Sequence, residues 1–444
     1  GRATGHFGIG TGGCKNGRFV SVDVPGAGKG GSTMRLYVLE LKRLLKTRSV
    51  GILIIAALIL SAVLSYLPVT YIQAYKTDKS GTIQVVTGIE AIKAKKADKK
   101  ALHGEMTEAK IRETIADIKE VLKEYGSLER QNIPLDVYVK KVYSHLDIIA
   151  VLEQTIIPNG KNLYTLEYSY ISEDDAKNVY TAYRENVQNL NKNPEVQKKI
   201  NQMTKHIQIP LAYYSEFTTD QLDYYQIYLF LVMIFFMVII TPVFATEYQT
   251  GSDQILRCTK HGRFRLAITK MPVVFTLIFA VFAVGTTVFS IIMRILYGAE
   301  VFKNPLQMLG YLYYIPAFTV GKMYKVMVAG GLLSLVAVGA SILFFSAKCK
   351  TVQSALICAF ATAFVPMVIF TISNSRNILE ILRCIFPTSG LAFMNSLEGE
   401  LLARNFVQIG SGYYWTPYII AIAAAIWIPV FLVITVVSYC KREA

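Results

Sequence analysis

The sequence contains few charged residues for its length. Only 17% of its 444 residues are Asp, Glu, Lys or Arg, whereas soluble domains usually carry about 25%. Hydrophobic residues make up 53% of the chain, and the mean hydropathy is +0.38. This composition argues against a soluble protein and indicates a membrane protein.

Patterns on which enzymes depend are also missing. The sequence contains no HExxH and no GxSxG motif, and its most apolar stretches hold almost no ionisable residues. None of the six cysteines forms a CxxC pair, and none lies in the long polar stretch that covers residues 76–222. We therefore expect no catalytic site, no metal site and no disulfide framework. Ion-coupled transport is also disfavoured, because it usually requires ionisable residues inside the membrane.

A phosphate-binding loop is absent as well. Residues 23–33 read DVPGAGKGGST, but a phosphate loop needs Gly-Lys followed by Ser or Thr, and here the third residue is Gly. The first 33 residues are Gly-rich, have no hydrophobic period and do not begin with Met. Codons for Lys29, Gly30 and Gly31 can contain a bacterial ribosome-binding sequence just before Met34. We predict that residues 1–33 are a non-native or disordered leader and that Met34 is the native start.

Long apolar runs are the main feature that is present. Each has close to the 20 apolar residues that a helix needs to cross a bilayer. One such run alone could be a buried core helix, but several with almost no interior charge favour membrane spans. We predict six spans: Val50–Ile72, Tyr225–Phe244, Met271–Ile295, Val326–Ala347, Val352–Ile372 and Pro417–Tyr439.

The distribution of charge predicts the topology. The formal net charge is +15, and its excess lies in short segments beside the apolar runs, whereas residues 76–222 are nearly balanced. Short loops rich in Lys and Arg stay on the cytoplasmic side. We therefore expect a multi-pass protein of the bacterial plasma membrane with both termini in the cytoplasm and residues 76–222 outside.

Hydrophobic periodicity divides the chain further. Residues 34–48 alternate apolar and basic residues at helical spacing, which predicts an amphipathic helix at the inner membrane interface; the alternative is a simple extension of the first span, residues 49–75. Residues 76–222 read as a helical extracytoplasmic domain, in which Ile111, Ile115, Ile118 and Leu122 recur at three- and four-residue steps. Residues 223–444 hold the other five spans.

The loop between the fifth and sixth spans, residues 374–400, is unusual. Its apolar residues are too few to span, and the sequence Pro387-Thr388-Ser389-Gly390 interrupts them. A short helix, a break and a second short helix predict a re-entrant segment, and the alternative is a surface loop with one amphipathic helix. The expected fold is an all-α polytopic membrane protein.

The loop between the second and third spans is polar and basic. It reads EYQTGSDQILRCTKHGRFRLAITK, from Glu247 to Lys270, and it could be a nucleic-acid patch, a solvated loop or a docking surface for a partner. The topology places it in the cytoplasm and explains its charge without nucleic acid. We predict that Arg263, Arg265 and Lys270, together with Arg43, anchor the chain to anionic lipid headgroups, at about 1 kcal/mol each.

The same loop resembles that of the permease subunit in ABC-2-type ABC transporters. In that family the second span runs into a Phe, a Glu, a Gly and a short helix, and then an Arg stands seven residues before a Lys. The matching residues here are Phe244, Glu247, Gly251, Ile255, Leu256, Arg263 and Lys270. Lys260 stands where the family often has Pro. The resemblance extends from Met34 to the C-terminus, apart from residues 76–222, which look like an insertion.

The resemblance implies a division of labour between subunits. Residues from Glu247 to about Thr259 would form a coupling helix that fits a cleft on a separate ABC ATPase, with Glu247, Gly251, Ile255 and Leu256 as the coupling residues. Glu247 would meet a basic group on the ATPase or cap its own helix, and Gly251 would allow close backbone approach. This chain would hold no cofactor, because ATP and Mg²⁺ would bind the ATPase.

The function implied is that of an exporter permease, which is not itself an enzyme. It would act with a second copy or a related permease and move a peptide, lipid or drug-like molecule. A different interpretation is a receptor or scaffold that senses a ligand through residues 76–222. A third is the macrolide-exporter class, whose permeases have four spans rather than six.

Overall fold

The computed structural model describes residues 29–78, 80–157, 161–214, 219–257, 263–372 and 377–441. Most of the predicted leader, residues 1–28, lies outside these ranges. The first helix, α1, covers Lys29–Lys46 and so begins before Met34.

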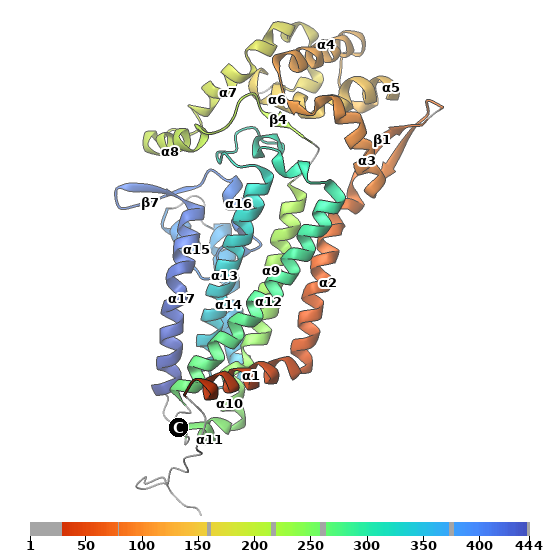
Figure 1. Cartoon of the computed structure of the whole chain (residues 1–444). Coiled ribbons are helices and arrows are strands. Elements are labelled where there is room, and N and C mark those ends of the chain that lie inside the picture. The colour runs from red at the N-terminus through yellow and green to blue at the C-terminus, as the bar shows by residue number, and fades with distance from the viewer. Residues whose placement is uncertain are drawn as a thin grey trace, which may run out of the picture.

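Six helices in the described part of the chain are long and apolar enough to cross a membrane, which confirms the six predicted spans. They stand side by side as a bundle (Figure 1). They are α2 (Arg48–Tyr71), α9 (Asp220–Ile240) with its continuation α10 (Pro242–Thr250), α12 (Phe264–Tyr297), α13 (Val320–Lys348), α14 (Val352–Ile372) and α17 (Thr416–Lys441).

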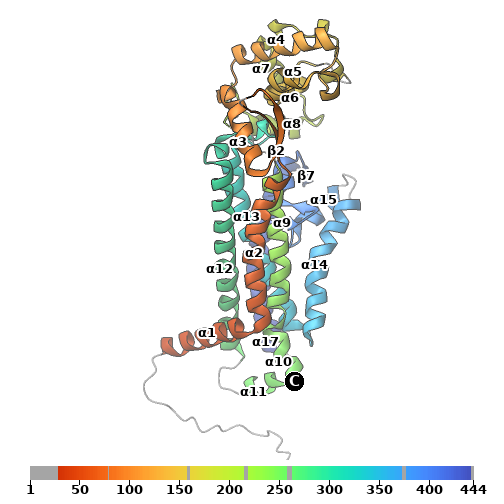
Figure 2. The ribbon, with the colours of Figure 1, turned by 90° about the vertical axis from the view of Figure 1, so that its right-hand side faces the viewer.

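The centre of the bundle is formed by α9 and α13. In each, 61% of the most apolar stretch is buried, compared with 22% in α14, which stands to one side of the bundle (Figure 2). Two glycines of α13 bring it close to its neighbours α9 and α12. A Cβ atom at Gly331 would lie 2.7 Å from Leu229 Cδ1, and one at Gly339 would lie 2.5 Å from Ile278 Cδ1. Small residues at such crossings allow tight backbone packing, which is how helices associate in membranes.

Helix α1 lies across one end of the bundle, which we call the α1 end (Figure 1). The Tyr37 hydroxyl donates a hydrogen bond to Thr276 Oγ1 of α12 at 2.7 Å. Thr47 separates α1 from α2, with extended backbone angles of φ −72° and ψ 117°. The amphipathic segment is thus a separate helix rather than an extension of the first span.

A helical domain, residues 73–214, covers the opposite end, which we call the domain end (Figures 1 and 2). The predicted apolar face of α4 is confirmed, since Ile111, Ile115, Ile118 and Leu122 are at most 2% exposed. The elements are β1 (Gln73–Thr77), β2 (Ile83–Thr87), α3 (Gly88–Asp98), β3 (Gly104–Glu105), α4 (Glu108–Tyr125), α5 (Leu135–Val137), α6 (Leu146–Thr155), α7 (Val179–Val187), α8 (Pro194–Thr204) and β4 (Ala212–Tyr213).

The loop between α12 and α13 joins this domain to the bundle. The Tyr313 hydroxyl donates to the Gln154 carbonyl oxygen at 2.6 Å, and the Leu312 N–H donates to Gln154 Oε1 at 2.9 Å. The Tyr313 ring stacks on Tyr183 at a centroid distance of 5.8 Å. The domain therefore contacts the bundle through this loop as well as through its own two chain connections.

The segment between α14 and α17 differs from the prediction in its second half. Helix α15 (Asn377–Ile385) is the expected first helix, but a hairpin of β5 (Leu391–Ala392) and β6 (Asn395–Ser396) precedes the second, α16 (Leu397–Leu402). A second hairpin, β7 (Phe406–Ile409) and β8 (Gly412–Trp415), follows. The all-α prediction is corrected to this extent: the described residues include four two-stranded sheets. Residues 374–376 lie outside the described ranges.

Candidate functional site

The long helix formed by α9 and α10 is interrupted at Thr241, just before Pro242, a position we call the α9–α10 junction. Proline has no N–H group and breaks the regular ladder of helix hydrogen bonds. The Ser346 hydroxyl of α13 bonds to the backbone on both sides of this break. Its Oγ accepts from the N–H groups of Phe244 at 2.9 Å and Ala245 at 3.2 Å, and it donates to the Thr241 carbonyl oxygen at 2.7 Å. Helix α10 is thereby fixed to α13.

Gly251 ends α10 in the left-handed conformation, with φ +70°. A Cβ atom there would meet nothing within 4 Å. The glycine is thus explained by the turn it makes, since a left-handed helix end favours glycine. The predicted coupling helix is therefore not continuous from Glu247: α10 stops at Thr250, and a separate short helix, α11, covers Ser252–Arg257. Residues 258–259, its predicted end, lie outside the described ranges.

Helix α11 presents an apolar side chain to the outside of the molecule. Ile255 is 74% exposed, while Leu256 is half-buried and packs against the core of the bundle. In Figures 1 and 2, α11 lies at the extreme of the α1 end. Of the four predicted coupling residues, Ile255 is the one whose side chain is most available to a partner.

Glu247 lies inside the protein, which corrects its assignment as a residue that meets a partner or caps its own helix. It is 3% exposed and forms an ion pair with Lys270 of α12. The Tyr439 hydroxyl of α17 donates to Glu247 Oε2 at 3.2 Å, and Arg43 Nη1 of α1 lies 3.5 Å from Glu247 Oε1. One carboxylate on α10 therefore contacts three other helices.

Lys270 is corrected for the same reason. It is 1% exposed, so it does not reach lipid headgroups. Its Nζ donates to the Val243 carbonyl oxygen at 2.8 Å and lies 4.9 Å from the centre of the Phe244 ring. A buried ammonium is costly unless it is paired and hydrogen-bonded, and Glu247 and Val243 provide both. Of the other predicted anchors, Arg43 and Arg263 are exposed and Arg265 is half-buried.

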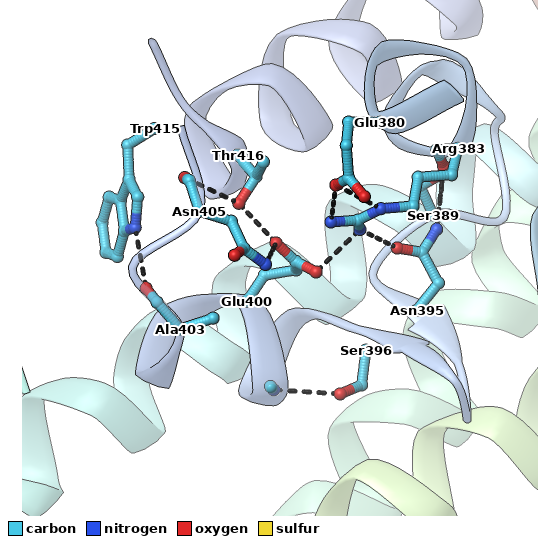
Figure 3. A network of polar contacts seen from close by, with 11 residues as sticks. Glu380, Arg383, Ser389, Asn395, Ser396, Glu400, Ala403, Asn405, Trp415 and Thr416 are labelled. Carbon is cyan, nitrogen blue, oxygen red and sulfur yellow. Dashed lines mark hydrogen bonds and ion pairs between the residues drawn. The ribbon is translucent and has the colours of Figure 1, made fainter. Parts of the chain in front are cut away.

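A second polar cluster, which sequence reasoning missed, lies near the domain end and is centred on Arg383 of α15 (Figure 3). The guanidinium is fully buried. It donates to Glu380 Oε2 at 2.8 Å, Asn395 Oδ1 at 2.8 Å and Glu400 Oε1 at 2.7 Å. The Thr416 hydroxyl donates to the other oxygen of Glu400. The cluster joins α15, β6, α16 and the start of α17.

The sequence did carry a signal for this cluster. Arg383 lies near the end of a mostly apolar helix, three residues after Glu380, and a charged residue that is buried in such a place needs a partner of opposite charge. The pattern of residues 374–400 predicts two short helices around a break, but not the hairpin that brings Asn395 to Arg383.

Comparison with known proteins identifies the family. A sequence model of the family described as ABC-2 family transporter protein matches residues 111–437. The matched range includes most of the helical domain, which had been expected to lie outside the resemblance. Searches of the curated proteins and of the solved structures returned no match. The match covers well over half of the chain, including spans two to five and most of the sixth, and the chain belongs to the ABC-2 family of transporter proteins.

Proposed function

We propose that this chain is the permease subunit of an ABC exporter, which moves a peptide, lipid or drug-like molecule across the plasma membrane. ATP, with Mg²⁺, would be hydrolysed by a separate ABC ATPase, and the transport path would form between this chain and a second copy or a related permease. The α1 end is cytoplasmic in this proposal, because its flanking segments carry the excess of Lys and Arg. The helical domain then lies outside.

The observation that carries the proposal is the way α11 is joined to the bundle. Ile255 is exposed on α11, and the adjoining α10 contacts α1 and α12 through Glu247, α17 through Tyr439, and α13 through Ser346. A displacement of α11 by an ATPase would thus act on four helices at once. In this proposal Ile255 makes the contact, and Glu247 positions α10 to transmit it.

Arg43, Arg263 and Arg265 keep their proposed role as headgroup contacts. Their basic side chains lie at the α1 end, where anionic lipids of the inner leaflet attract Lys and Arg. Such contacts would hold α1 and the start of α12 at the membrane surface while α11 moves.

The experiment that tests the coupling role replaces Ile255 by Asp and compares it with the matched control Ile255→Leu. The variants are expressed with the ATPase that co-purifies with the wild-type chain from native membranes. Loss of an apolar interface anchor costs about 2 kcal/mol, so Ile255→Asp should weaken association roughly 30-fold, and Ile255→Leu should retain it. An unchanged unfolding midpoint in both variants shows that the bundle is intact. Equal association of the two variants would refute the proposed contact, and the absence of any co-purifying ATPase would refute the permease function.

A further inference from the structure

A cavity of about 270 Å³ lies beside the Glu247–Lys270 pair, between the α1–α2 turn and the α9–α10 junction. Its lining is divided in two. Arg43, Thr47 and Ser49 provide a polar end, and Leu53 and Val238 belong to an apolar end. Two of its lining residues have roles proposed above, Glu247 in positioning α10 and Arg43 as a headgroup contact. Binding at this cavity would deepen the role of Arg43, and it rests on the proposed placement of the α1 end at the inner leaflet.

The polar end lies beside a basic stretch of the chain. The Arg43 side chain is 50% exposed, and its two terminal nitrogens lie 2.8 Å from Glu40 and 3.5 Å from Glu247. A guanidinium has five N–H donors, so further donors remain for an anion. Lys42, Lys46 and Arg48 are exposed on the same short stretch. The carboxylate of Glu247, which also lines the cavity, is neutralised by Lys270 and bound by Tyr439.

The apolar end reaches the outer surface of the bundle. Val238 on α9 is 38% exposed, and Leu53 on α2 is half-buried. Leu53 lies five residues after Arg48, the first residue of α2, which corresponds to about 7.5 Å along the helix axis. The cavity therefore extends from the end of the first span into its apolar part. A phospholipid has the same arrangement, with a polar headgroup at one end and apolar acyl chains at the other.

We propose that this cavity binds an anionic phospholipid, with the phosphate against Arg43 and the acyl chains between α2 and α9 along Leu53 and Val238. A cavity of about 270 Å³ has room for a glycerophosphate group and is too small for the whole lipid. The acyl chains therefore leave the cavity past Val238. A lipid bound in this way holds the α1–α2 turn against α10. The site does not depend on the identity of the ATPase or of the cargo.

The test uses the purified full-length chain in detergent with dioleoyl phosphatidylglycerol or dioleoyl phosphatidylcholine, and native mass spectrometry counts the lipids retained. We expect the wild type to retain the anionic lipid about tenfold more strongly. Arg43→Gln should remove that preference and Arg43→Lys should keep most of it. Val238→Trp fills the apolar exit without changing charge and should reduce retention of both lipids. The matched controls are Arg35→Gln on α1 and Ile55→Trp on α2, two exposed residues that do not line the cavity.

Each other outcome overturns the proposal. If Arg43→Gln and Arg35→Gln lose the preference for the anionic lipid equally, the preference comes from the overall positive charge and not from this cavity. Equal losses in Val238→Trp and Ile55→Trp would indicate general contact with the belt of lipids. Displacement of the anionic lipid by inorganic phosphate, with Val238→Trp silent, would identify a site for a free anion. Val238→Trp leaves the ion pairs untouched. The comparison of Val238→Trp with Ile55→Trp therefore still tests the proposal if Arg43→Gln disturbs the fold.

Discussion

The buried pair of Glu247 and Lys270 makes a prediction that separates its two partners. In Glu247→Gln the amide oxygen still accepts from Tyr439, but Lys270 keeps only the Val243 carbonyl oxygen, at 2.8 Å. In Lys270→Met the Glu247 carboxylate keeps its hydrogen bond from Tyr439. It can also pair more closely with Arg43, which already lies 3.5 Å away and is half exposed. The first variant therefore leaves an uncompensated buried cation, and the second leaves an anion with a substitute partner.

The expected magnitudes follow from this difference. Removing one partner of a buried ion pair costs about 3–5 kcal/mol, and Glu247→Gln should fall in that range. Lys270→Met should cost about 1–3 kcal/mol, the usual range for a buried polar group that loses one of several partners. The double variant Glu247→Gln/Lys270→Met removes both charges, and such replacements are often close to neutral, so it should recover to within about 1.5 kcal/mol of the wild type.

The assay is denaturant unfolding of the purified chain in detergent micelles, with the four proteins arranged as a double-mutant cycle. Two results would refute the reasoning. If the double variant loses as much as the sum of the single variants, the two charges do not stabilise each other. If Lys270→Met costs more than Glu247→Gln, Arg43 does not act as a substitute partner.

Three further predictions concern other contacts. Ser346→Ala should cost about 1–3 kcal/mol, measured by denaturation, because two buried N–H groups at the α9–α10 junction lose the hydroxyl that accepts their hydrogen bonds; a cost near zero would show that the junction needs no such partner. Burial, together with the neighbouring carboxyl of Asp223 at the start of α9, raises the pKa of Glu398 to about 8. A group whose pKa is higher in the folded state contributes stability that is fully present below its unfolded-state pKa. This contribution is lost as the pH rises through the folded-state pKa. The wild-type unfolding midpoint should therefore fall between about pH 5 and pH 8, more steeply than that of Glu398→Gln, and parallel pH profiles would contradict this. Gly285→Ala would overlap the Tyr228 hydroxyl and should cost about 1–3 kcal/mol, whereas the control Gly51→Ala, with nothing within 4 Å, should be neutral or stabilising; equal effects would contradict the packing argument.

The six spans could be predicted because a membrane span depends on local composition. A run of about 20 apolar residues suffices, and the predicted first span, Val50–Ile72, agrees closely with α2, Arg48–Tyr71. The predicted third span, Met271–Ile295, lies inside α12, which begins seven residues earlier, at Phe264. The reason is Lys270, whose charge marks the edge of an apolar run in the sequence but is neutralised by Glu247 in the fold.

The candidate site shows where sequence reasoning stopped. The sequence pointed to Glu247, Gly251, Ile255 and Lys270. It did not show which residues contact the Glu247 carboxylate. Lys270 is 23 residues away and Tyr439 is 192 residues away, and only the packing of α10 against α12 and α17 brings them together. The roles of Glu247 and Lys270 therefore changed from surface contact to internal connection.

The segment before the last span was harder to predict for a related reason. Hydrophobicity distinguishes a span from a loop, but it does not predict two-residue strands such as β5 and β6, whose pairing depends on the turn between them. The Arg383 cluster depends on that turn, because it brings Asn395 within 2.8 Å of the guanidinium.

The most direct test of the central claim places a photo-crosslinking amino acid at position 255 and irradiates native membranes. The account predicts that the main adduct contains an ATP-binding subunit of an ABC transporter, identified by mass spectrometry. It also predicts that the same probe at position 295, on an exposed face at the domain end of α12, gives no such adduct. If position 255 yields no ATPase adduct while that ATPase is present in the membranes, α11 does not receive the force of ATP hydrolysis and the account is wrong.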